Sequence, residues 1–363
     1  MTRLAASCLL LLALGQAAHA EDTRAFRMGF TPFPYDITAE AVADTREFLR
    51  ENADIIAFHM ESVPWTEALA GEPFRDGLMA DWEYKRGIMP PEAKTYVAVS
   101  PGRDGLGNYW GDEENQPVPT EFVGRPFDDS DVKTAFTSYC RRVVEYFQPD
   151  YLAIGIEVNE ILPKGPEKWE AYLALHRHVY AALKAEHPGL PVFASFTLHN
   201  MLDWQGVPND SMIAAFDELM PTNDMVAVSF YPFVGGLSPR VDESFAWMTG
   251  HYDAFGKPFV VTETGEAAEE LVFPSTGQAI ANTPEMQRAY YERVFALAQE
   301  RSFPFVISFL YRDYDALWEK IKDTSPEFFM AWRDCGLLDE AGVDRPARDV
   351  WRSHFDRPLR AEP

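Results

Sequence analysis

The chain is poor in cysteine, and this limits the roles that thiols can have in it. Only three cysteines occur among its 363 residues. Cys8 belongs to the N-terminal leader, while Cys140 and Cys335 lie outside any Cys/His cluster with the spacing of metal ligands. This pattern argues against a thiolate metal site. We expect two buried thiols, and a single disulfide is the alternative if the protein reaches an oxidising compartment.

Positive charge is also scarce. The sequence has 32 Lys and Arg residues against 57 Asp and Glu residues, which gives a formal net charge of −25 at pH 7. Nucleic acids and anionic membrane surfaces attract basic proteins, so this composition excludes both as expected partners. The acidic excess favours solubility and carries no information about an uncharged substrate.

Beyond the first twenty residues the sequence has no apolar run long enough to span a bilayer. Residues 1–20 have the features of a signal peptide: Arg3, an apolar stretch over residues 9–14, and the small residues of Ala18-His19-Ala20. We expect cleavage after Ala20 and a secreted or periplasmic protein of residues 21–363, without membrane insertion. The sequence does not indicate an oligomeric state.

No glycine-rich phosphate-binding sequence opens the first predicted helix, which argues against a Rossmann-type fold, and we expect no cofactor. Strand-like and helix-like patterns instead alternate along the chain. The predicted strands cover residues 27–31, 54–59, 94–100, 151–158, 191–198, 225–230, 258–262 and 305–310. The predicted helices include residues 39–52, 131–147, 167–186, 210–219, 242–255 and 284–300. Eight such units predict an α/β protein of one domain, a (β/α)₈ TIM barrel with long βα loops.

Three connections after predicted strands, residues 61–93, 101–129 and 264–283, are too long for simple turns. They would cover the face of a barrel where the carboxyl ends of the strands lie and where substrate sites form. Aromatic rings stack on the apolar faces of sugars. We therefore name Trp65 and Trp110 as candidate substrate contacts, while other loop aromatics pack beneath the loops.

Two predicted strands end in glutamates. Glu160 follows Asn159 after the fourth strand, and Glu263 ends the run of residues 259–262 at the seventh. Two carboxyl groups at one end of a barrel are the minimum equipment for cleaving a glycosidic bond. Glu157 and Glu266 are rival carboxylates; we interpret Glu157 as a supporting residue inside the barrel and expect Glu266 to point into a loop.

Further polar residues follow other predicted strands. Tyr231, after the sixth, can donate its hydroxyl to Glu263, and Asn159 can bind a sugar hydroxyl. His199 follows the fifth strand, and Arg312 follows the eighth, where a guanidinium can hold a carboxylate or a hydroxyl. We include all four as candidate substrate-site residues, although each of them alone is more often structural.

Together, Asn159-Glu160, Tyr231-Pro232 and Thr262-Glu263-Thr264-Gly265 resemble the motifs of clan A glycoside hydrolases. Residues 224–233 and the closing segment of residues 336–348 are similar to those of the family 53 arabinogalactan endo-β-1,4-galactanases, and the resemblance covers residues 150–348. It implies that Glu160 is the acid/base, Glu263 the nucleophile, Asn159 the ligand of the sugar 2-hydroxyl, and Tyr231 the partner of Glu263. It also implies a retaining double displacement, with a β-1,4-galactan among the substrates.

Two other functions fit the same residues. A non-catalytic carbohydrate-binding barrel is favoured by the second strand, which ends in Phe58-His59-Met60-Glu61 where the clan has an arginine. A metal-dependent hydrolase using His59, Glu61 and His199 is the third hypothesis, and it lacks a compact ligand motif. The leading hypothesis is a retaining β-glycoside hydrolase acting on a poly- or oligosaccharide.

Overall fold

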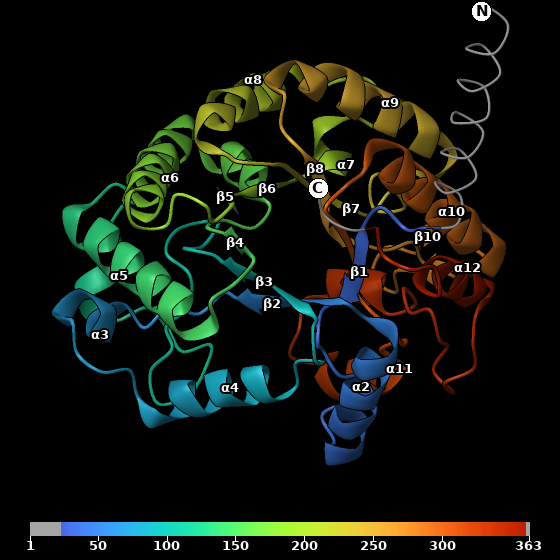
Figure 1. Cartoon of the computed structure of the whole chain (residues 1–363), viewed down its shortest axis with the longest axis horizontal. Helices are drawn as coiled ribbons and strands as arrows, with labels where there is room; N and C mark the ends of the chain where they lie inside the picture. The colour runs from blue at the N-terminus through green and yellow to red at the C-terminus, as the bar shows by residue number, and fades with distance from the viewer. Residues whose placement is uncertain (1–22, 361–363) are drawn as a thin grey trace, which may run out of the picture.

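Parallel strands form the centre of the computed structural model, which describes residues 23–360 (Figure 1). Their hydrogen-bonded order is β5-β4-β3-β2-β1-β11-β8-β7-β6. Only Ala194 separates β5 from β6, so these two pieces are one interrupted strand that pairs with β4 on one side and β7 on the other. The sheet therefore closes into an eight-stranded barrel. The strands are β1 (Arg27–Phe30), β2 (Ile55–Met60), β3 (Lys94–Val99), β4 (Tyr151–Ala153), β5 (Val192–Phe193), β6 (Ser195–Thr197), β7 (Val226–Phe230), β8 (Phe259–Thr264) and β11 (Phe305–Ser308).

Helices surround the strands, as Figure 1 shows. The helices that follow successive strands are α2 (Ala39–Asn52), α4 (Asp76–Gly87), α5 (Ser130–Phe147), α6 (Pro166–Glu186), α8 (Asp210–Leu219), α9 (Val241–Tyr252), α10 (Pro284–Arg301) and α12 (Pro346–Phe355). Shorter elements lie in the connections: α3 (Trp65–Ala70), α7 (Leu198–Met201), α11 (Asp315–Ile321), and the hairpin of β9 (Leu271–Val272) and β10 (Ala279–Ile280). This arrangement confirms the predicted (β/α)₈ barrel.

Side-chain caps explain why several helices begin where they do. The Thr38 hydroxyl accepts the Ala41 amide at the start of α2 (3.2 Å), and the Asp129 carboxylate accepts the Asp131 amide at the start of α5 (2.8 Å). Each of these bonds satisfies an amide that has no partner within its helix. Helix α10 begins with proline, whose fixed φ suits the first turn.

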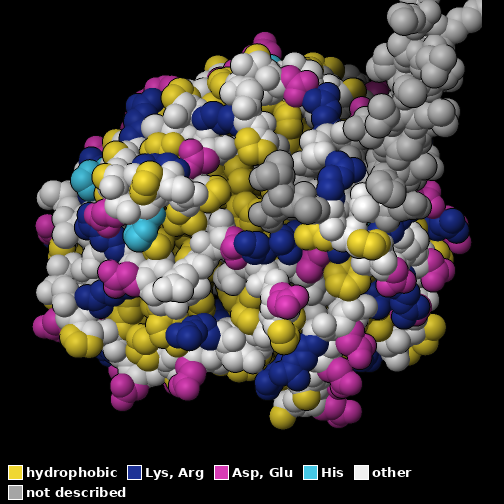
Figure 2. All heavy atoms as spheres, in the orientation of Figure 1, with side chains coloured by type: hydrophobic (Ala, Val, Ile, Leu, Met, Phe, Trp, Pro, Cys, Tyr) yellow, Lys and Arg dark blue, Asp and Glu magenta, His cyan; other side chains and the backbone are white. Residues whose placement is uncertain are grey.

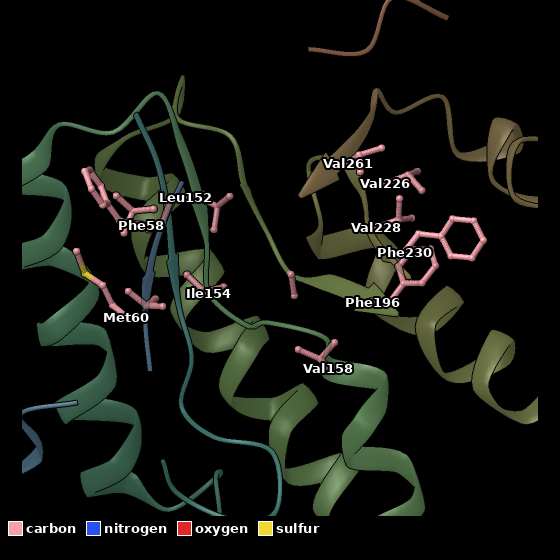
Figure 3. Close-up of a cluster of buried hydrophobic side chains, with 14 of the residues drawn as sticks. Phe58, Met60, Leu152, Ile154, Val158, Phe196, Val226, Val228, Phe230 and Val261 are labelled. Carbon is pink, nitrogen blue, oxygen red and sulfur yellow. The ribbon is translucent and has the colours of Figure 1, made fainter. Parts of the chain in front are cut away.

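The core has two layers, because alternate residues of each strand point to opposite sides. On β2, Ile55 and Ala57 pack inside the barrel, whereas Ile56, Phe58 and Met60 pack outward against the helices. Figure 3 shows part of the outer layer, with side chains from β2, β4, β6, β7 and β8. Both layers are buried, so the strands read as nearly continuous apolar runs.

The fourth strand is shorter than predicted. Residues 151–158 are predicted as a strand, but β4 ends at Ala153, and residues Val158–Lys164 form the 3₁₀ segment η2. Gly155 passes so close to helix α6 that a Cβ atom there would lie 2.1 Å from the Tyr172 hydroxyl. Glu157 then adopts a left-handed backbone conformation with φ of 52°. The alternation predicted for this segment therefore fails before the glutamates.

The prediction of two buried thiols is confirmed, since Cys140 and Cys335 are both buried and unpaired. The predicted signal peptide of residues 1–20 lies outside the described residues. Between residues 23 and 360, no helix combines the length and apolar character that a membrane span requires. Basic and acidic side chains are both scattered over the face that Figure 2 shows.

Candidate active site

A cavity of about 370 Å³ lies where βα connections leave the carboxyl ends of the strands. This is the face of a (β/α)₈ barrel on which catalytic groups gather. Residues of β2 and β8 contribute to it, together with the connections that follow β1, β2, β3, β4 and β11. Its lining consists of Phe33, His59, Glu61, Arg103, Glu157, Glu263, Phe309, Tyr314, Leu317, Trp318, Ile321, Phe329, Trp332 and Arg333.

Glu263 reaches this cavity from β8, with a side chain that is only 12% exposed. Its carboxylate accepts a hydrogen bond from the hydroxyl of Tyr231, which follows β7, as predicted from the sequence. The Nδ1 atom of His59, on β2, lies 3.4 Å from the same carboxylate. Burial raises the pKa of Glu263, and the charge of Glu157 raises this pKa further, while the Tyr231 hydrogen bond opposes both.

Glu157 also lines the cavity, and several contacts hold its carboxylate in place. Its main-chain amide donates to the Ser195 hydroxyl (3.0 Å), and its Oε1 accepts the Ser229 hydroxyl (2.6 Å). Its Oε2 lies 3.3 Å from Arg103 Nη1, and Arg103 also pairs with Glu61 at 3.7 Å. Burial of Arg103 disfavours its charge, but these carboxylates outweigh burial and raise the pKa of its guanidinium. Arg103 and Ser229 therefore fix the position of the Glu157 carboxylate.

The carboxyl groups of Glu157 and Glu263 interact electrostatically, because the charge of Glu157 raises the pKa of Glu263. Burial is the larger cause of this rise, and the guanidinium of Arg103 opposes it. The cavity therefore brings together two carboxyl groups in different environments, and such pairs serve general acid and nucleophilic catalysis.

Glu160, which the sequence pattern selected, lies on η2 beside this pair but is not among the residues lining the cavity. Its carboxylate accepts hydrogen bonds from the Asn200 side-chain amide and from Thr197 Oγ1 (3.3 Å). Burial raises its pKa, and the charge of Glu157 adds to this effect. The catalytic role of Glu160 stays a prediction, whereas Glu157 has the position expected of a group that reaches substrate.

Asn159 and His199 support the site from outside the cavity. The Asn159 amide donates to the carbonyl and hydroxyl oxygens of Thr197 (3.1 and 2.9 Å), and its Oδ1 accepts the Thr197 amide (2.9 Å). This exchange ties η2 to β6. The buried His199 accepts the Tyr231 amide at Nδ1 (3.4 Å), and burial lowers its pKa to about 4. Each of these two side chains therefore fixes a stretch of backbone, and that stretch contains either a cavity residue or the hydrogen-bond partner of one.

The candidate substrate contacts Trp65, Trp110 and Arg312 are not among the residues that line this cavity, and a role in substrate binding stays a prediction for them. Trp65 is fully buried in the core, where its indole donates to the Gly107 carbonyl (3.1 Å). Trp110 belongs to the same core cluster. The Arg312 guanidinium stacks on the Tyr35 ring at 3.8 Å and donates to a backbone carbonyl (2.7 Å). The tryptophans of these long loops pack into the core, while Glu61 and Arg103 of the same loops line the cavity.

We expect the substitution Trp65→Ala to lower the stability of the folded protein. Removing a fully buried indole leaves a cavity and should lower the free energy of unfolding by about 3–5 kcal/mol. Denaturant unfolding measures this loss, and Trp65→Phe should recover most of it, because a ring fills much of the space. A Trp65→Ala protein of wild-type stability with weakened substrate binding would favour Trp65 as a ligand contact.

Sequence reasoning missed the aromatic side of the cavity. Most of it comes from the connection after β11, which supplies residues between 309 and 333, and Phe33 adds a ring from the connection after β1. The run Phe328-Phe329-Met330-Ala331-Trp332 was the available signal. Its distance from the glutamates in sequence concealed its role.

Glu266, the rival carboxylate near Glu263, is buried away from the cavity. The Ser238 hydroxyl donates to it (2.8 Å), but burial prevails and raises its pKa to about 8. An acid with a raised folded-state pKa binds more protons folded than unfolded, so its contribution to stability falls as pH rises between its unfolded and folded pKa values.

We therefore expect Glu266→Gln to make the protein less sensitive to alkali. Between about pH 5 and 8, the wild-type protein should lose stability relative to the variant, with a slope that approaches 1.4 kcal/mol per pH unit. Thermal unfolding of both proteins across this range measures the difference. Parallel stability profiles would show that Glu266 ionises normally in the folded state.

The residues of the metal hypothesis are not brought together. Among residues 23–360, the acidic groups close enough to share an ion lie around Asp313, and His59, Glu61 and His199 form no such group. Asp313 is itself paired with the Arg345 guanidinium.

Comparisons with known proteins bear on the fold. No protein-family model and no curated protein matches the chain by sequence. Among solved structures, it is similar to an exo-β-1,4-mannosidase from Opitutaceae bacterium strain TAV5, with a TM-score of 0.62 and 12% identity over 92% of this chain. The chain spans 59% of the length of that enzyme.

Two other neighbours match over more of their own length. Fungal β-1,4-galactanases give a TM-score of 0.57 and 14% identity, over 90% of this chain and 94% of theirs. A GH5_18 protein from Bifidobacterium longum, solved with Manβ1-4GlcNAc, gives 0.62 and 15%, over 93% of this chain and 80% of its own. The structural neighbours are thus clan A glycoside hydrolases, and at these identities the similarity is one of fold.

Proposed function

We propose that the protein is an exported retaining β-glycoside hydrolase. The observation that carries this proposal is the presence of two carboxyl groups, Glu157 and Glu263, in one cavity at the strand ends of a barrel. Retaining glycosidases need two such groups on either side of the scissile bond. Glu263 is the nucleophile, and Glu157 is favoured over Glu160 as the acid/base because Glu157 lines the cavity.

In the first step a Glu263 oxygen attacks the anomeric carbon while the glycosidic C–O bond breaks, and the acid/base gives its proton to the departing oxygen. In the second step water attacks the glycosyl ester, loses a proton to the acid/base, and releases both the sugar and the Glu263 carboxylate. Two inversions at the same carbon retain its configuration.

The contacts around the pair support these roles. The reaction requires a proton on the acid/base and a charge on Glu263, and the Tyr231 hydrogen bond favours that charge. The 3.4 Å contact with His59 helps to orient the nucleophile.

The proposed substrates are β-linked sugars. The names of the structural neighbours include a β-1,4-mannosidase and β-1,4-galactanases, and a β-1,4-galactan is therefore one candidate. The signal peptide of residues 1–20, removed from a barrel of residues 21–363, would deliver the enzyme to a secreted or periplasmic location.

The experiment is a survey of β-glycosides and β-glycans with the mature protein, in which NMR follows the anomeric configuration of the first product. Release of the β-anomer from a β-linked substrate is expected. Release of the α-anomer would overturn the double displacement. Tight glycan binding in calorimetry without any bond cleavage would instead favour the non-catalytic carbohydrate-binding barrel.

A further inference from the structure

The lining of the cavity has an unusual composition for a polysaccharide site. Eight of its fourteen residues are aromatic or aliphatic, six are charged or histidine, and none is Asn, Gln, Ser or Thr. Neutral amides and hydroxyls commonly fix the orientation of polar ligands in pockets. The cavity therefore offers few groups that can form specific hydrogen bonds with the hydroxyls of a neutral oligosaccharide.

The charged residues of the lining are already engaged. Arg333 pairs with both oxygens of Asp334 (2.8 and 2.7 Å), and Arg103 pairs with Glu157 and Glu61. Carboxyl groups outnumber these guanidiniums, so an anionic sugar would meet repulsion. Three donors of lining residues are buried without a partner in the described structure: Arg103 Nε, the Tyr314 hydroxyl and the Trp332 indole. Three donors suffice for a single sugar ring or a carbonyl group.

Helix α11 supplies the aliphatic part of the wall. Leu317, Trp318 and Ile321 line the cavity from this helix, and 317 and 318 lie next to 321 on the helix surface. Ion pairs fix the helix in place, from Lys320 to Asp36 at 2.5 Å and from Asp315 to Arg333 at 3.5 Å. Aliphatic side chains cannot stack as aromatic rings do, and they favour ligand groups without hydroxyls.

This wall adjoins the nucleophile. The Trp332 ring lies 5.5 Å from that of Tyr231, whose hydroxyl contacts Glu263, and the Phe33 ring lies 6.0 Å from the His59 ring. The cavity volume of about 370 Å³ is near the lower end of the 300–1,000 Å³ typical of small-molecule sites. The space suits one sugar ring with a modest substituent better than several sugar units.

We propose that the substrate is a small β-glycoside with an apolar substituent, an alkyl, aryl or acyl group, that packs against α11 and Phe329. This inference rests on the proposed function and names its substrate class. The substituent is either the leaving group on the anomeric oxygen or an ester on the sugar, and the shared chemistry is an apolar chain attached to one sugar.

Binding of non-hydrolysable alkyl 1-thio-β-glycosides tests the inference without relying on turnover. Calorimetry with the methyl, butyl and hexyl compounds of glucose, galactose and mannose, below their micelle concentrations, should show affinity rising by about fourfold per methylene until the cavity is filled. A methyl glycoside carrying a hexanoyl ester tests the second position of the chain. Affinity independent of chain length in both series, or much tighter binding of a tetrasaccharide than of the hexyl glycoside, would overturn the inference.

The double variant Leu317→Asn/Ile321→Asn tests whether these side chains of α11 bind the apolar substituent. The ratio of hexyl to methyl affinity should fall at least tenfold, because each amide makes the wall polar, while Val343→Asn, at an exposed apolar residue outside the cavity, should leave the ratio unchanged. Phe329→Ser, at a ring that is 53% exposed, is a second variant if the first fails to fold. An unchanged ratio in a folded variant rejects the wall. Chain-length dependence of binding, together with no hydrolysis of the corresponding alkyl O-β-glycosides, would reject the proposed function and leave only the binding of an apolar substituent by this wall.

Discussion

Replacement of Glu263 by alanine is expected to lower kcat/KM roughly 10⁴-fold or more on any glycoside that the wild-type protein cleaves, the scale of loss when one member of a covalent catalytic unit is removed. The reason is geometric as well as chemical. Glu263 ends a buried strand, and its carboxylate has a hydroxyl donor and an imidazole on either side, so no other oxygen is held in its place. Glu157 is anchored to Ser229 and Arg103 and cannot substitute for it.

Rescue of the reaction by added azide distinguishes loss of the nucleophile from loss of the folded structure. In Glu263→Ala the small anion fits the space of the missing carboxylate and attacks a β-glycoside with a good leaving group, which should give an α-glycosyl azide. Glu266→Gln is a matched control, because it removes a buried carboxylate three positions away that does not line the cavity, and it should keep activity within a few fold. Undiminished hydrolysis by Glu263→Ala would remove Glu263 from the mechanism.

The barrel could be predicted in detail because its signals are local. Periodicity and capping residues mark the helices, so the predicted bounds of residues 39–52 and 210–219 agree with α2 and α8. Apolar runs mark the strands in the same way. Strand ends in a parallel barrel lie at one face whatever their separation in sequence, and this rule brought Glu263 and Tyr231 together correctly.

Glu157, the acid/base that we propose, could not be selected in this way, because the direction of its side chain depends on backbone beyond the end of a strand. Strand alternation assigned Glu157 to a supporting role, but β4 ends at Ala153 and the chain turns through a left-handed residue at Glu157 itself. At Gly155 the chain passes so close to Tyr172 of the following helix that only glycine fits there. No local pattern reports such a contact.

The aromatic wall depends on contacts even more distant in sequence. Helix α11 is held by the ion pair between Lys320 and Asp36, which lie near opposite ends of the chain. Conversely, the tryptophans of the long loops pack in the core, because burial of a large ring is favourable wherever space is available. The composition of a loop predicts that its aromatic side chains will be buried. It does not predict whether they will be buried in the core or in the wall of a cavity.

Glu157→Ala and Glu160→Ala are expected to differ sharply, and this comparison decides the acid/base. For an alkyl β-glycoside, whose leaving oxygen needs a proton, Glu157→Ala should lower kcat/KM by about 10²–10⁴-fold, the usual contribution of general acid catalysis. For a dinitrophenyl glycoside, which leaves without protonation, the loss should be far smaller. Azide should then give a β-glycosyl azide, since it attacks the glycosyl ester of an intact Glu263.

Glu160→Ala should change both substrates by only a few fold, because Asn200 and Thr197 occupy its carboxylate away from the cavity. The pH dependence gives an independent test. The charge of Glu157 raises the pKa of Glu263, so its removal should move the acidic limb of kcat/KM to lower pH, whereas removal of Glu160 should leave that limb in place. The reverse pattern, with strong dependence on leaving group and β-azide product in Glu160→Ala, would make Glu160 the acid and require the η2 segment to rotate its carboxyl into the cavity when substrate binds.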